Sequence, residues 1–501
     1  MGRETQEIIA FVLYLAVVLA VGVVFFLKSR KSIGGEKEYF LGGRKLNGWV
    51  AALSAGASDM SAWVLMGLPG SIYLYGMGQV WISIGLFVGT ILAWIFVAPR
   101  LRRFSIASND SITIPQYLTN RFKTNNKVLL IVCAIIFLVA YCIYAASSIV
   151  ACGDLFNTVF GFNKTWAMVG ATAIILVYTF LGGFNAVCWT DFIQGMLMLV
   201  ALMAVPIIAC FAMGASDFAP AAEVVTGENY YNFLSSGKFD WKSIADILSG
   251  FGWGLGYFGM PHILVRYMSI RSEKEMKKSR VIGIFWTGLI LLMASVVALV
   301  AHEYLGNSLE EGSQSLVFIH MVRNLMPAFI GGLLLSAILA ASMSTADSQL
   351  LTSASAFSAD VYKPIIRKKA GNKEMLIVGR IVVAVISVIA LVIAMAPGTG
   401  GIMDLVSNAW GAFGAAFGPT ILLSLHWKRF TYSGALAGIV TGFVVDVLWL
   451  MFFSSTGIYE IIPGFIASLI VAIVVTLIGK KPSAEVEALF DEASKKTKDF
   501  D

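Results

Sequence analysis

The sequence predicts an all-α polytopic membrane protein, and three observations support this fold class. Of the 501 residues, 58% are hydrophobic and only 13% are charged, whereas soluble domains are typically about 25% charged. The mean hydropathy is +0.81. Apolar runs of about 20 residues, the length that crosses a bilayer as a helix, recur along the chain, and basic residues gather in alternate connections between them.

The apolar runs predict about 13 transmembrane helices. The first run follows a single basic residue, Arg3, and ends without a small-residue cleavage motif, so we expect a spanning helix there and not a signal peptide. The expected spans cover residues 7–27, 48–74, 79–99, 128–153, 165–181, 189–213, 243–265, 281–302, 327–356, 377–396, 401–425, 432–453 and 459–479.

The basic residues orient these spans. With the amino terminus outside, all but five of the 36 Lys and Arg residues lie on the inner side. The five on the outer side are Arg3, Lys164, Lys238, Lys242 and Arg323. This bias predicts an outer amino terminus and an inner carboxyl terminus. Because every Lys and Arg then falls in a loop or at a helix end, we expect no buried cation at mid-depth.

Cysteine and histidine usage argues against a metal or disulfide framework. The five cysteines lie in apolar runs without C-x-x-C spacing, and the four histidines are scattered. No nucleophile or phosphate-binding loop stands in a context that indicates catalysis, so we do not expect an enzyme. Nucleic acid is not an expected partner, and no oligomer is required.

The second span carries polar and helix-breaking residues at hydrocarbon depth. They are Ser54, Ser58, Asp59, Ser61, Gly67, Pro69 and Gly70. An ionisable side chain there costs about 2.5–3.5 kcal/mol on insertion scales, which makes Asp59 a candidate functional residue. Irregular backbone at that depth is tolerated where it lines a cavity or is buried in protein, so we expect a broken helix. The alternative is a small-residue helix interface in which Asp59 bonds a neighbouring helix.

A second interrupted span lies at residues 248–261, which are rich in glycine and contain Pro261. Its G-x-G-x-x-G spacing is not preceded by a strand, so we do not interpret it as a dinucleotide site. If the first span is an extra helix, the broken spans open two five-helix groups, residues 48–213 and 243–425. Paired broken helices in corresponding halves indicate a midplane site in an inverted-repeat transporter.

The remaining organisation follows from this division. Because the first repeat has an odd number of helices, the second repeat begins on the opposite side of the membrane and is inverted relative to the first. Residues 432–479 are expected to form two peripheral helices packed through small residues. Residues 1–480 then form a single transmembrane transporter domain, and residues 481–501 form a cytoplasmic tail.

A stripe of hydroxyl groups is expected in the ninth span. Ala341, Ser344, Thr345 and Ser348 stand at i, i+3, i+4 and i+7 and share one helical face, with Asp347 beside them. Hydroxyls together with the free carbonyls of a broken helix offer oxygen ligands without high charge, which suits sodium. The alternative is that these hydroxyls bond carbonyls one turn back and only bend the helix.

Aromatic residues in or beside the broken spans could form an organic site. Trp63, Tyr144, Trp253 and Tyr257 stand at apolar depth, where single rings are more often core or lipid-facing. A small zwitterion could place its carboxylate at a half-helix amino end and its ammonium over a ring.

Other acidic residues at depth have less certain roles. Asp191 caps the sixth span, anchors to cytoplasmic cations or relays the ion. Asp446, deep in the twelfth span, is expected to have a structural partner.

These residues occur within motifs that resemble the sodium/solute symporter family over nearly the whole chain. The motifs are YFLGGR at 39–44, LSAGASDMS at 53–61, LMGLPG at 65–70, GWGLGYFG at 252–259, PHIL at 261–264, LSAILAA at 335–341 and MST at 343–345. The resemblance implies a LeuT-type 5+5 inverted repeat preceded by one extra helix. It also implies sodium-coupled uptake of L-proline by alternating access across a bacterial cytoplasmic membrane.

The resemblance further implies site residues. A sodium ion would be held by the carbonyls of Ala57, Met60 and Ala341 and the hydroxyls of Ser344 and Thr345, with Asp59 nearby. Proline contacts would fall to Ser61, Trp63, Tyr144, Trp253, Tyr257, Pro261 and Gly332. A second sodium site is suggested at Asp191, Asp347 and Ser348.

The chain departs from the family pattern at two positions. Ala62 stands where the proline carriers commonly have glycine, so the pocket size is open. Asp347 stands where relatives often have serine, so the sodium stoichiometry is open. Alternatives to proline uptake are symport of another small neutral amino acid or a sugar, and a sodium-permeable channel or solute sensor.

Overall fold

The computed structural model describes residues 2–31, 36–181, 183–214, 229–306, 309 and 312–495, and their regular secondary structure is helical apart from one isolated β-bridge. The α-helices are α1 (Arg3–Lys31), α2 (Glu36–Leu41), α3 (Gly48–Met60), α4 (Gly67–Tyr75), α5 (Val80–Leu92), α6 (Ala98–Ala107), α7 (Ile114–Arg121), α8 (Val128–Phe160), α9 (Lys164–Leu181), α10 (Phe184–Met213), α11 (Trp241–Trp253), α12 (Pro261–Met268), α13 (Glu273–Leu305), α14 (Val317–Leu325), α15 (Ala328–Ser355), α16 (Asn372–Met395), α17 (Ile402–His426), α18 (Tyr432–Phe452), α19 (Ile461–Ile478) and α20 (Ala484–Ser494).

Nine helical segments within the described residues are long and apolar enough to cross a membrane. They are Arg3–Val24, Met77–Ala107, Val128–Phe160, Phe184–Met213, Glu273–Leu305, Ala328–Ile366, Asn372–Met395, Tyr432–Phe452 and Ile461–Ile478. Each coincides with an expected span. The other expected spans fall on the short helix α9, on α17 and on the two interrupted segments. The all-helical class is therefore confirmed, and the number of crossings stays a prediction.

The first interrupted segment breaks directly after Asp59 and Met60. Helix α3 begins behind Asn47, whose side chain accepts hydrogen bonds from the amides of Trp49 and Val50. It ends where Ser61 takes a φ of +46°, a left-handed conformation that is costly for a residue other than glycine. The Ser61 hydroxyl accepts a bond from the amide of Trp63 at 3.1 Å, which stabilises the short 3₁₀ turn Ala62–Val64 before α4.

The second interrupted segment breaks directly after Trp253. Helix α11 ends there, the turn η5 (Gly254–Phe258) is a tight 3₁₀ helix, and α12 starts at Pro261. Proline suits the first turn of a helix because its missing N–H would have had no helical partner. Both predicted breaks are therefore present, and each divides a run of apolar residues into two half-helices.

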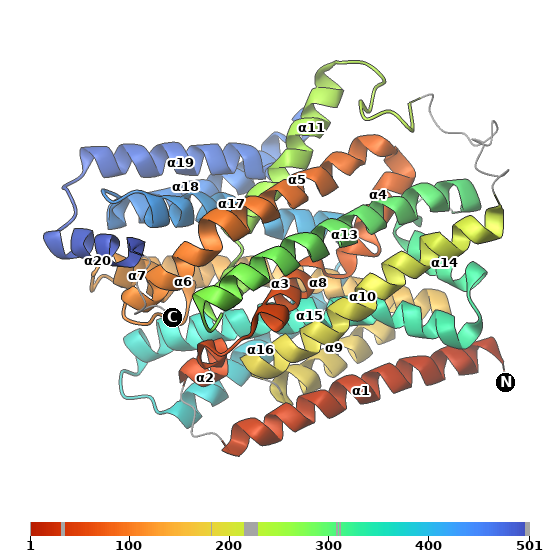
Figure 1. Ribbon diagram of the computed structural model, residues 1–501, viewed down its shortest axis with the longest axis horizontal. Coiled ribbons are helices and arrows are strands. Elements are labelled where there is room, and N and C mark those ends of the chain that lie inside the picture. The colour runs from red at the N-terminus through yellow and green to blue at the C-terminus, as the bar shows by residue number, and fades with distance from the viewer. Residues whose placement is uncertain are drawn as a thin grey trace.

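The broken segments lie in the interior of a helical bundle. Helix α3 packs against α10, α12, α13 and α15, and η5 packs against α5 and α17. Helix α5 and η5 contact each other through their backbones at Gly89 and Gly254. A methyl group on Gly89 would lie 2.3 Å from the carbonyl oxygen of Gly254, so no side chain fits between them. In Figure 1, α18 and α19 lie side by side along one edge of the molecule and α1 along the opposite edge.

Candidate functional site

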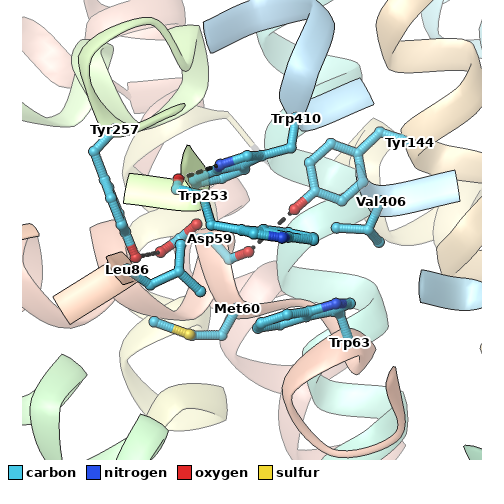
Figure 2. A pocket seen from close by; sticks show the side chains of 9 residues that line it. All are labelled: Asp59, Met60, Trp63, Leu86, Tyr144, Trp253, Tyr257, Val406 and Trp410. Carbon is cyan, nitrogen blue, oxygen red and sulfur yellow. Dashed lines mark hydrogen bonds between the residues drawn. The ribbon is translucent and has the colours of Figure 1, made fainter. Parts of the chain in front are cut away.

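A small chamber lies between the two broken segments (Figure 2). Its cavity volume is about 10 Å³, close to the smallest volume that holds one water molecule. The rings therefore nearly close the space, and a solute would need them to part. Its lining residues are Asp59, Met60, Trp63, Leu86, Tyr144, Trp253, Tyr257, Val406 and Trp410.

Indole rings form the wall of the chamber. Trp63, from the first break, stacks on Trp253, from the second, with 5.1 Å between ring centroids. Trp410 of α17 lies on the other side of Trp253, and its Nε1 donates to the Trp253 carbonyl oxygen at 2.7 Å. Tyr257 meets the Trp410 ring edge-on at 5.3 Å. The wall therefore joins both broken segments to α17 through apolar faces.

Asp59 links the two broken segments across the chamber. Its Oδ2 accepts a hydrogen bond from the Tyr257 hydroxyl at 2.5 Å, and its main-chain oxygen accepts one from the Tyr144 hydroxyl at 3.2 Å. The side chain is buried, and Figure 2 shows it between the rings that line the space. A buried carboxylate in this position favours a bound cation close by.

The end of α3 offers free carbonyl oxygens to the hydroxyl stripe of α15. The last four carbonyls of a helix lack helical partners, and in α3 these belong to residues 57–60. The Ser344 hydroxyl donates to the Ala57 carbonyl at 2.9 Å and to the Ala341 carbonyl at 3.1 Å. The Thr345 hydroxyl reaches the same Ala57 oxygen at 3.5 Å.

The stripe therefore faces the broken segment and not lipid, since Ser344 and Thr345 are fully buried. Four of the predicted sodium ligands come together: Ala57, Ala341, Ser344 and Thr345. The fifth, Met60, is the last residue of α3, the helix that carries Ala57. Their oxygens are neutral, and such a donor set with one carboxylate nearby suits a hard monovalent cation. The described residues contain no cluster of three or more His, Cys, Asp or Glu that could hold another metal.

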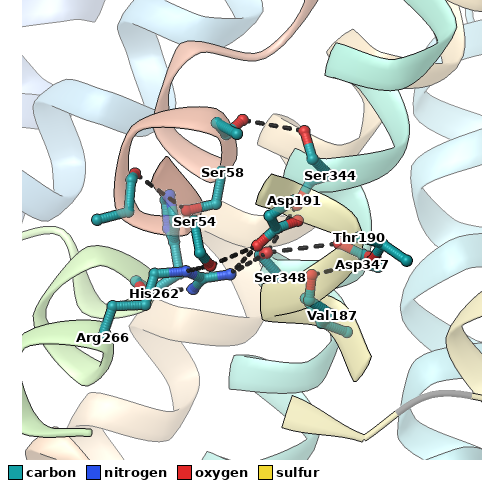
Figure 3. A network of polar contacts seen from close by, with 12 residues as sticks. Ser54, Ser58, Val187, Thr190, Asp191, His262, Arg266, Ser344, Asp347 and Ser348 are labelled. Atoms are coloured by element: carbon teal, nitrogen blue, oxygen red, sulfur yellow. Dashed lines mark hydrogen bonds and ion pairs between the residues drawn. The ribbon is translucent and has the colours of Figure 1, made fainter. Parts of the chain in front are cut away.

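A buried arginine lies one helix turn below this site, in the last turn of α12. Arg266 is only 1% exposed. Its Nη2 donates to Asp191 Oδ2 at 2.8 Å and to the Ser348 hydroxyl at 2.5 Å, and its Nε donates to the Ser54 hydroxyl at 2.7 Å (Figure 3). The sequence predicts Arg266 at a helix end, and it lies in the last turn of α12, where Asp191 balances its charge. The charge pattern does not predict that this side chain is buried.

Of the three residues suggested for a second sodium, Asp191 and Ser348 contact the guanidinium of Arg266, and Asp347 contacts Ser348. Ser348 lies 3.4 Å from Asp347 Oδ1 as well as beside Arg266. Asp191 Oδ1 and Asp347 Oδ2 have no hydrogen-bond partner among the described residues. Arg266 therefore pairs with Asp191, and the Ser348 hydroxyl lies between the guanidinium and Asp347.

The predicted substrate contacts separate into two groups. Trp63, Tyr144, Trp253 and Tyr257 line the chamber. Gly332 does not, because it lies against α1, where a methyl group would come within 2.8 Å of the Glu7 Cα atom. Its missing side chain allows close helix packing. Ser61 and Pro261 are buried at the two breaks, next to lining residues in the chain but not among the side chains that line the space.

Sequence reasoning missed three lining residues, Leu86, Val406 and Trp410. Leu86 and Val406 are single apolar residues in apolar runs, which carry no signal. Trp410 is more conspicuous, because it is a large ring followed by Gly411, Ala412 and Gly414. Small residues around a tryptophan at membrane depth indicate close packing on one side and could have marked it.

Comparison with known proteins identifies relatives over the full length of the chain. The model of the sodium:solute symporter family matches residues 39–442. Sodium/proline symporter 2 of Staphylococcus saprophyticus is 39% identical over 99% of this chain and 97% of its own. The sodium/proline symporter of Escherichia coli is 40% identical over 98% and 97%. The osmoregulated proline transporter OpuE of Bacillus subtilis is 40% identical over 97% of each chain.

Solved structures with the same arrangement of helices are also transporters. A sodium-coupled sialic acid symporter in its substrate-bound outward-open state matches with a TM-score of 0.78, 20% identity, and coverage of 95% of this chain and 99% of its own. A nucleobase-cation-symport-1 family transporter in a closed conformation matches with a TM-score of 0.55 and 13% identity, over 91% and 98%. At these identities the likeness concerns the fold alone.

Proposed function

The chain belongs to the sodium:solute symporter family, and from this premise we propose that it takes up L-proline across the cytoplasmic membrane of a bacterium, coupled to sodium. The observation that carries the proposal is the set of proline symporters about 40% identical over nearly the whole chain. The aromatic lining of the chamber and the neutral oxygen cluster beside it supply the chemistry that a small zwitterion and a sodium ion require. The protein is then a multi-pass carrier and not an enzyme.

We propose that sodium binds between α3 and α15. Its ligands are the carbonyls of Ala57, Met60 and Ala341 and the hydroxyls of Ser344 and Thr345, with Asp59 as the nearby negative charge. The hydrogen bonds from both hydroxyls to Ala57 support this placement, since they bring the two hydroxyls and the end of α3 together. An ion there would hold the first broken segment against α15.

Proline would bind in the chamber beside the ion. The apolar ring of proline suits the indole faces of Trp63 and Trp253, and its charged nitrogen suits the neighbourhood of Asp59 and the rings. Its carboxylate suits the amino end of a half-helix, where backbone N–H groups lack partners. Tyr144 and Tyr257 would complete the site. Ser61 and Pro261 would act by fixing the backbone at the two breaks.

We further propose the repeat organisation. One extra helix precedes two five-helix repeats, residues 48–213 and 243–425, and residues 432–479 are peripheral, within a transporter domain of residues 1–480. A break in the first segment of each repeat supports this division. About 13 crossings with an outer amino terminus follow from the charge bias. Residues 481–501 then lie inside, and cysteines introduced at 238 and 481 should be labelled from opposite sides.

Sodium can drive accumulation by thermodynamic coupling. One charge crossing 100 mV is worth about 2.3 kcal/mol, and a tenfold sodium gradient about 1.4 kcal/mol. One sodium per proline therefore sustains a proline gradient of roughly several hundredfold. This requires that bound sodium change the populations of the outward-facing and inward-facing states, because a loaded carrier that moved without sodium would dissipate the gradient.

The test is uptake of labelled proline into proteoliposomes under an imposed sodium gradient. We expect uphill accumulation that collapses when the gradient is removed and that excess unlabelled proline competes away. Equilibration without accumulation would instead indicate a channel. If another amino acid or a sugar competed more strongly than proline, that solute would be the substrate, and the proposal of sodium-coupled transport would stand.

A further inference from the structure

Two buried carboxyl groups lie behind the aromatic wall of the chamber, and the proposed transport mechanism uses neither. Asp446 on α18 is 2% exposed, and Glu460, the residue before α19, is 8% exposed. Within the described part of the chain, neither has a Lys or Arg partner. The structural partner expected for Asp446 is thus a second acid.

The two side chains face the same small space. Asp446 Oδ1 and Glu460 Oε1 are both buried and have no hydrogen-bond partner among the described residues. A methyl group on Gly411 of α17 would lie 2.9 Å from the first oxygen and 3.4 Å from the second. On α19, a methyl group on Gly464 would lie 3.2 Å from the Cβ atom of Asp446. The missing side chain of Gly411 therefore leaves room for both carboxyl oxygens, and that of Gly464 leaves room for the Asp446 side chain.

Two negative charges are not stable in such a place. A buried carboxylate without a cationic partner is costly, and two close carboxyl groups do not both ionise readily. A dehydrated metal ion needs several oxygen ligands, and the ranges that the structure describes contain no cluster of three or more His, Cys, Asp or Glu that could hold one. One proton shared between the two acids satisfies both. The other titratable group facing them is the phenol of Tyr459, whose hydroxyl donates to the Ser407 carbonyl at 2.7 Å.

We propose that Asp446 and Glu460 bind one proton between them, and that this proton holds the wall of the chamber in its substrate-binding form. The first half of the proposal stands on the geometry of the pair. The second half rests on the proposed function, because it concerns proline affinity.

The pair is joined to the chamber through its sequence neighbours. Tyr459 precedes Glu460, and its ring lies 5.2 Å from that of Trp253. Trp410 precedes Gly411 and donates to the Trp253 carbonyl. Release of the proton to solvent leaves two carboxylates that repel each other, and their separation displaces Tyr459 and Trp410. Trp253 then loses support on two sides, so proline binds more weakly at alkaline pH.

Infrared difference spectroscopy on the purified protein tests the first half. The wild type should show the C=O band of a protonated carboxylic acid at neutral pH, and this band should be missing from Asp446→Asn/Glu460→Gln. The variant Asp491→Asn is the matched control, since that carboxylate is exposed at the surface beside Lys428, and it should keep the band. Superimposed spectra of the wild type and the double variant would overturn the shared proton.

The proline affinity at saturating sodium tests the second half. Between neutral and alkaline pH, the half-saturating proline concentration should rise roughly fivefold or more in the wild type, the lower range of coupling between sites, and stay constant in Asp446→Asn/Glu460→Gln. An equal rise in both proteins, or none in the wild type, would overturn the link to the wall. A protein that binds no proline at any pH would refute the proposed function, and the infrared result would still decide the pair.

Discussion

Asp59 contacts the aromatic lining of the chamber through both its side chain and its backbone. It accepts the Tyr257 hydroxyl through its side chain and the Tyr144 hydroxyl through its backbone, and it follows the carbonyls that face the α15 stripe. Negative charge and free carbonyl oxygens therefore lie within one helix turn. The same residue can attract the ion and position the rings that contact the solute.

Removal of the Asp59 charge should weaken sodium binding. In Asp59→Asn we expect the half-saturating sodium concentration for proline uptake to rise tenfold or more, about 1.4 kcal/mol, since a full negative charge near the ion is lost. The control is Tyr257→Phe, which removes the hydrogen bond but leaves the charge, and which should affect proline more than sodium. An unchanged sodium dependence in Asp59→Asn would remove this residue from the ion site.

The hydroxyls of the stripe should act on sodium before they act on proline. We expect Ser344→Ala/Thr345→Ala to raise the half-saturating sodium concentration roughly tenfold, about 1.4 kcal/mol, while proline affinity at saturating sodium changes less. Ser342→Ala is the matched control, because the Ser342 hydroxyl donates to the Ile338 carbonyl of its own helix and is not one of the proposed ligands. If both variants behave alike, the hydroxyls serve the packing of α15 and not the ion.

Arg266 should stabilise the fold through Asp191. Truncating one partner of a buried ion pair typically costs about 3–5 kcal/mol, because the other charge is left unpaired. We therefore expect Arg266→Gln to lower the thermal unfolding midpoint sharply and Arg266→Gln/Asp191→Asn to recover much of the loss. A double variant no more stable than the single one would show that Arg266 stabilises through its contacts with Ser54 and Ser348.

At the scale of elements, the two breaks could be predicted because their causes are local. Glycine, proline and an ionisable residue at hydrocarbon depth disfavour a continuous helix wherever the rest of the chain lies. The partners of Arg266 could not be predicted in this way, since Asp191 and Ser348 reach it from α10 and α15. Trp410 is a similar case, because its role depends on the position of Trp253.

Gly332 shows the opposite error, a residue assigned by resemblance to the chamber but used to pack α15 on α1. A glycine in a membrane helix serves equally well for close packing and for access to a ligand. Only the neighbouring helix distinguishes the two uses, and the local sequence does not identify that neighbour.

The glycine contact between α5 and η5 should be intolerant of a side chain. In Gly89→Ala the new methyl group would meet the Gly254 carbonyl, and overpacking of this kind typically costs about 1–3 kcal/mol. We expect a lower unfolding midpoint and weaker proline binding, since η5 carries Tyr257. Gly170→Ala is the control, because nothing lies within 4 Å of a methyl group there. Equal effects of the two substitutions would contradict the close approach.

At the scale of the whole molecule, the number of sodium ions moved per proline depends on whether a second ion binds near Arg266. The charges around Arg266 therefore matter for this number. The cluster already contains a fixed cation between Asp191 and Ser348. We therefore expect one charge per proline from reversal potentials in proteoliposomes, unchanged in Asp347→Asn. Two charges in the wild type, reduced to one in that variant, would show that a second sodium binds beside the guanidinium.

The stacked indoles of Trp63 and Trp253 have a consequence for observing the transport cycle. Their rings belong to different broken segments and lie close enough for their electronic transitions to couple. A solute that slides between them, or a rocking motion that parts the segments, uncouples the two chromophores. The near-ultraviolet circular dichroism of the protein should therefore differ between a closed chamber and an occupied one. No added label is needed for this measurement.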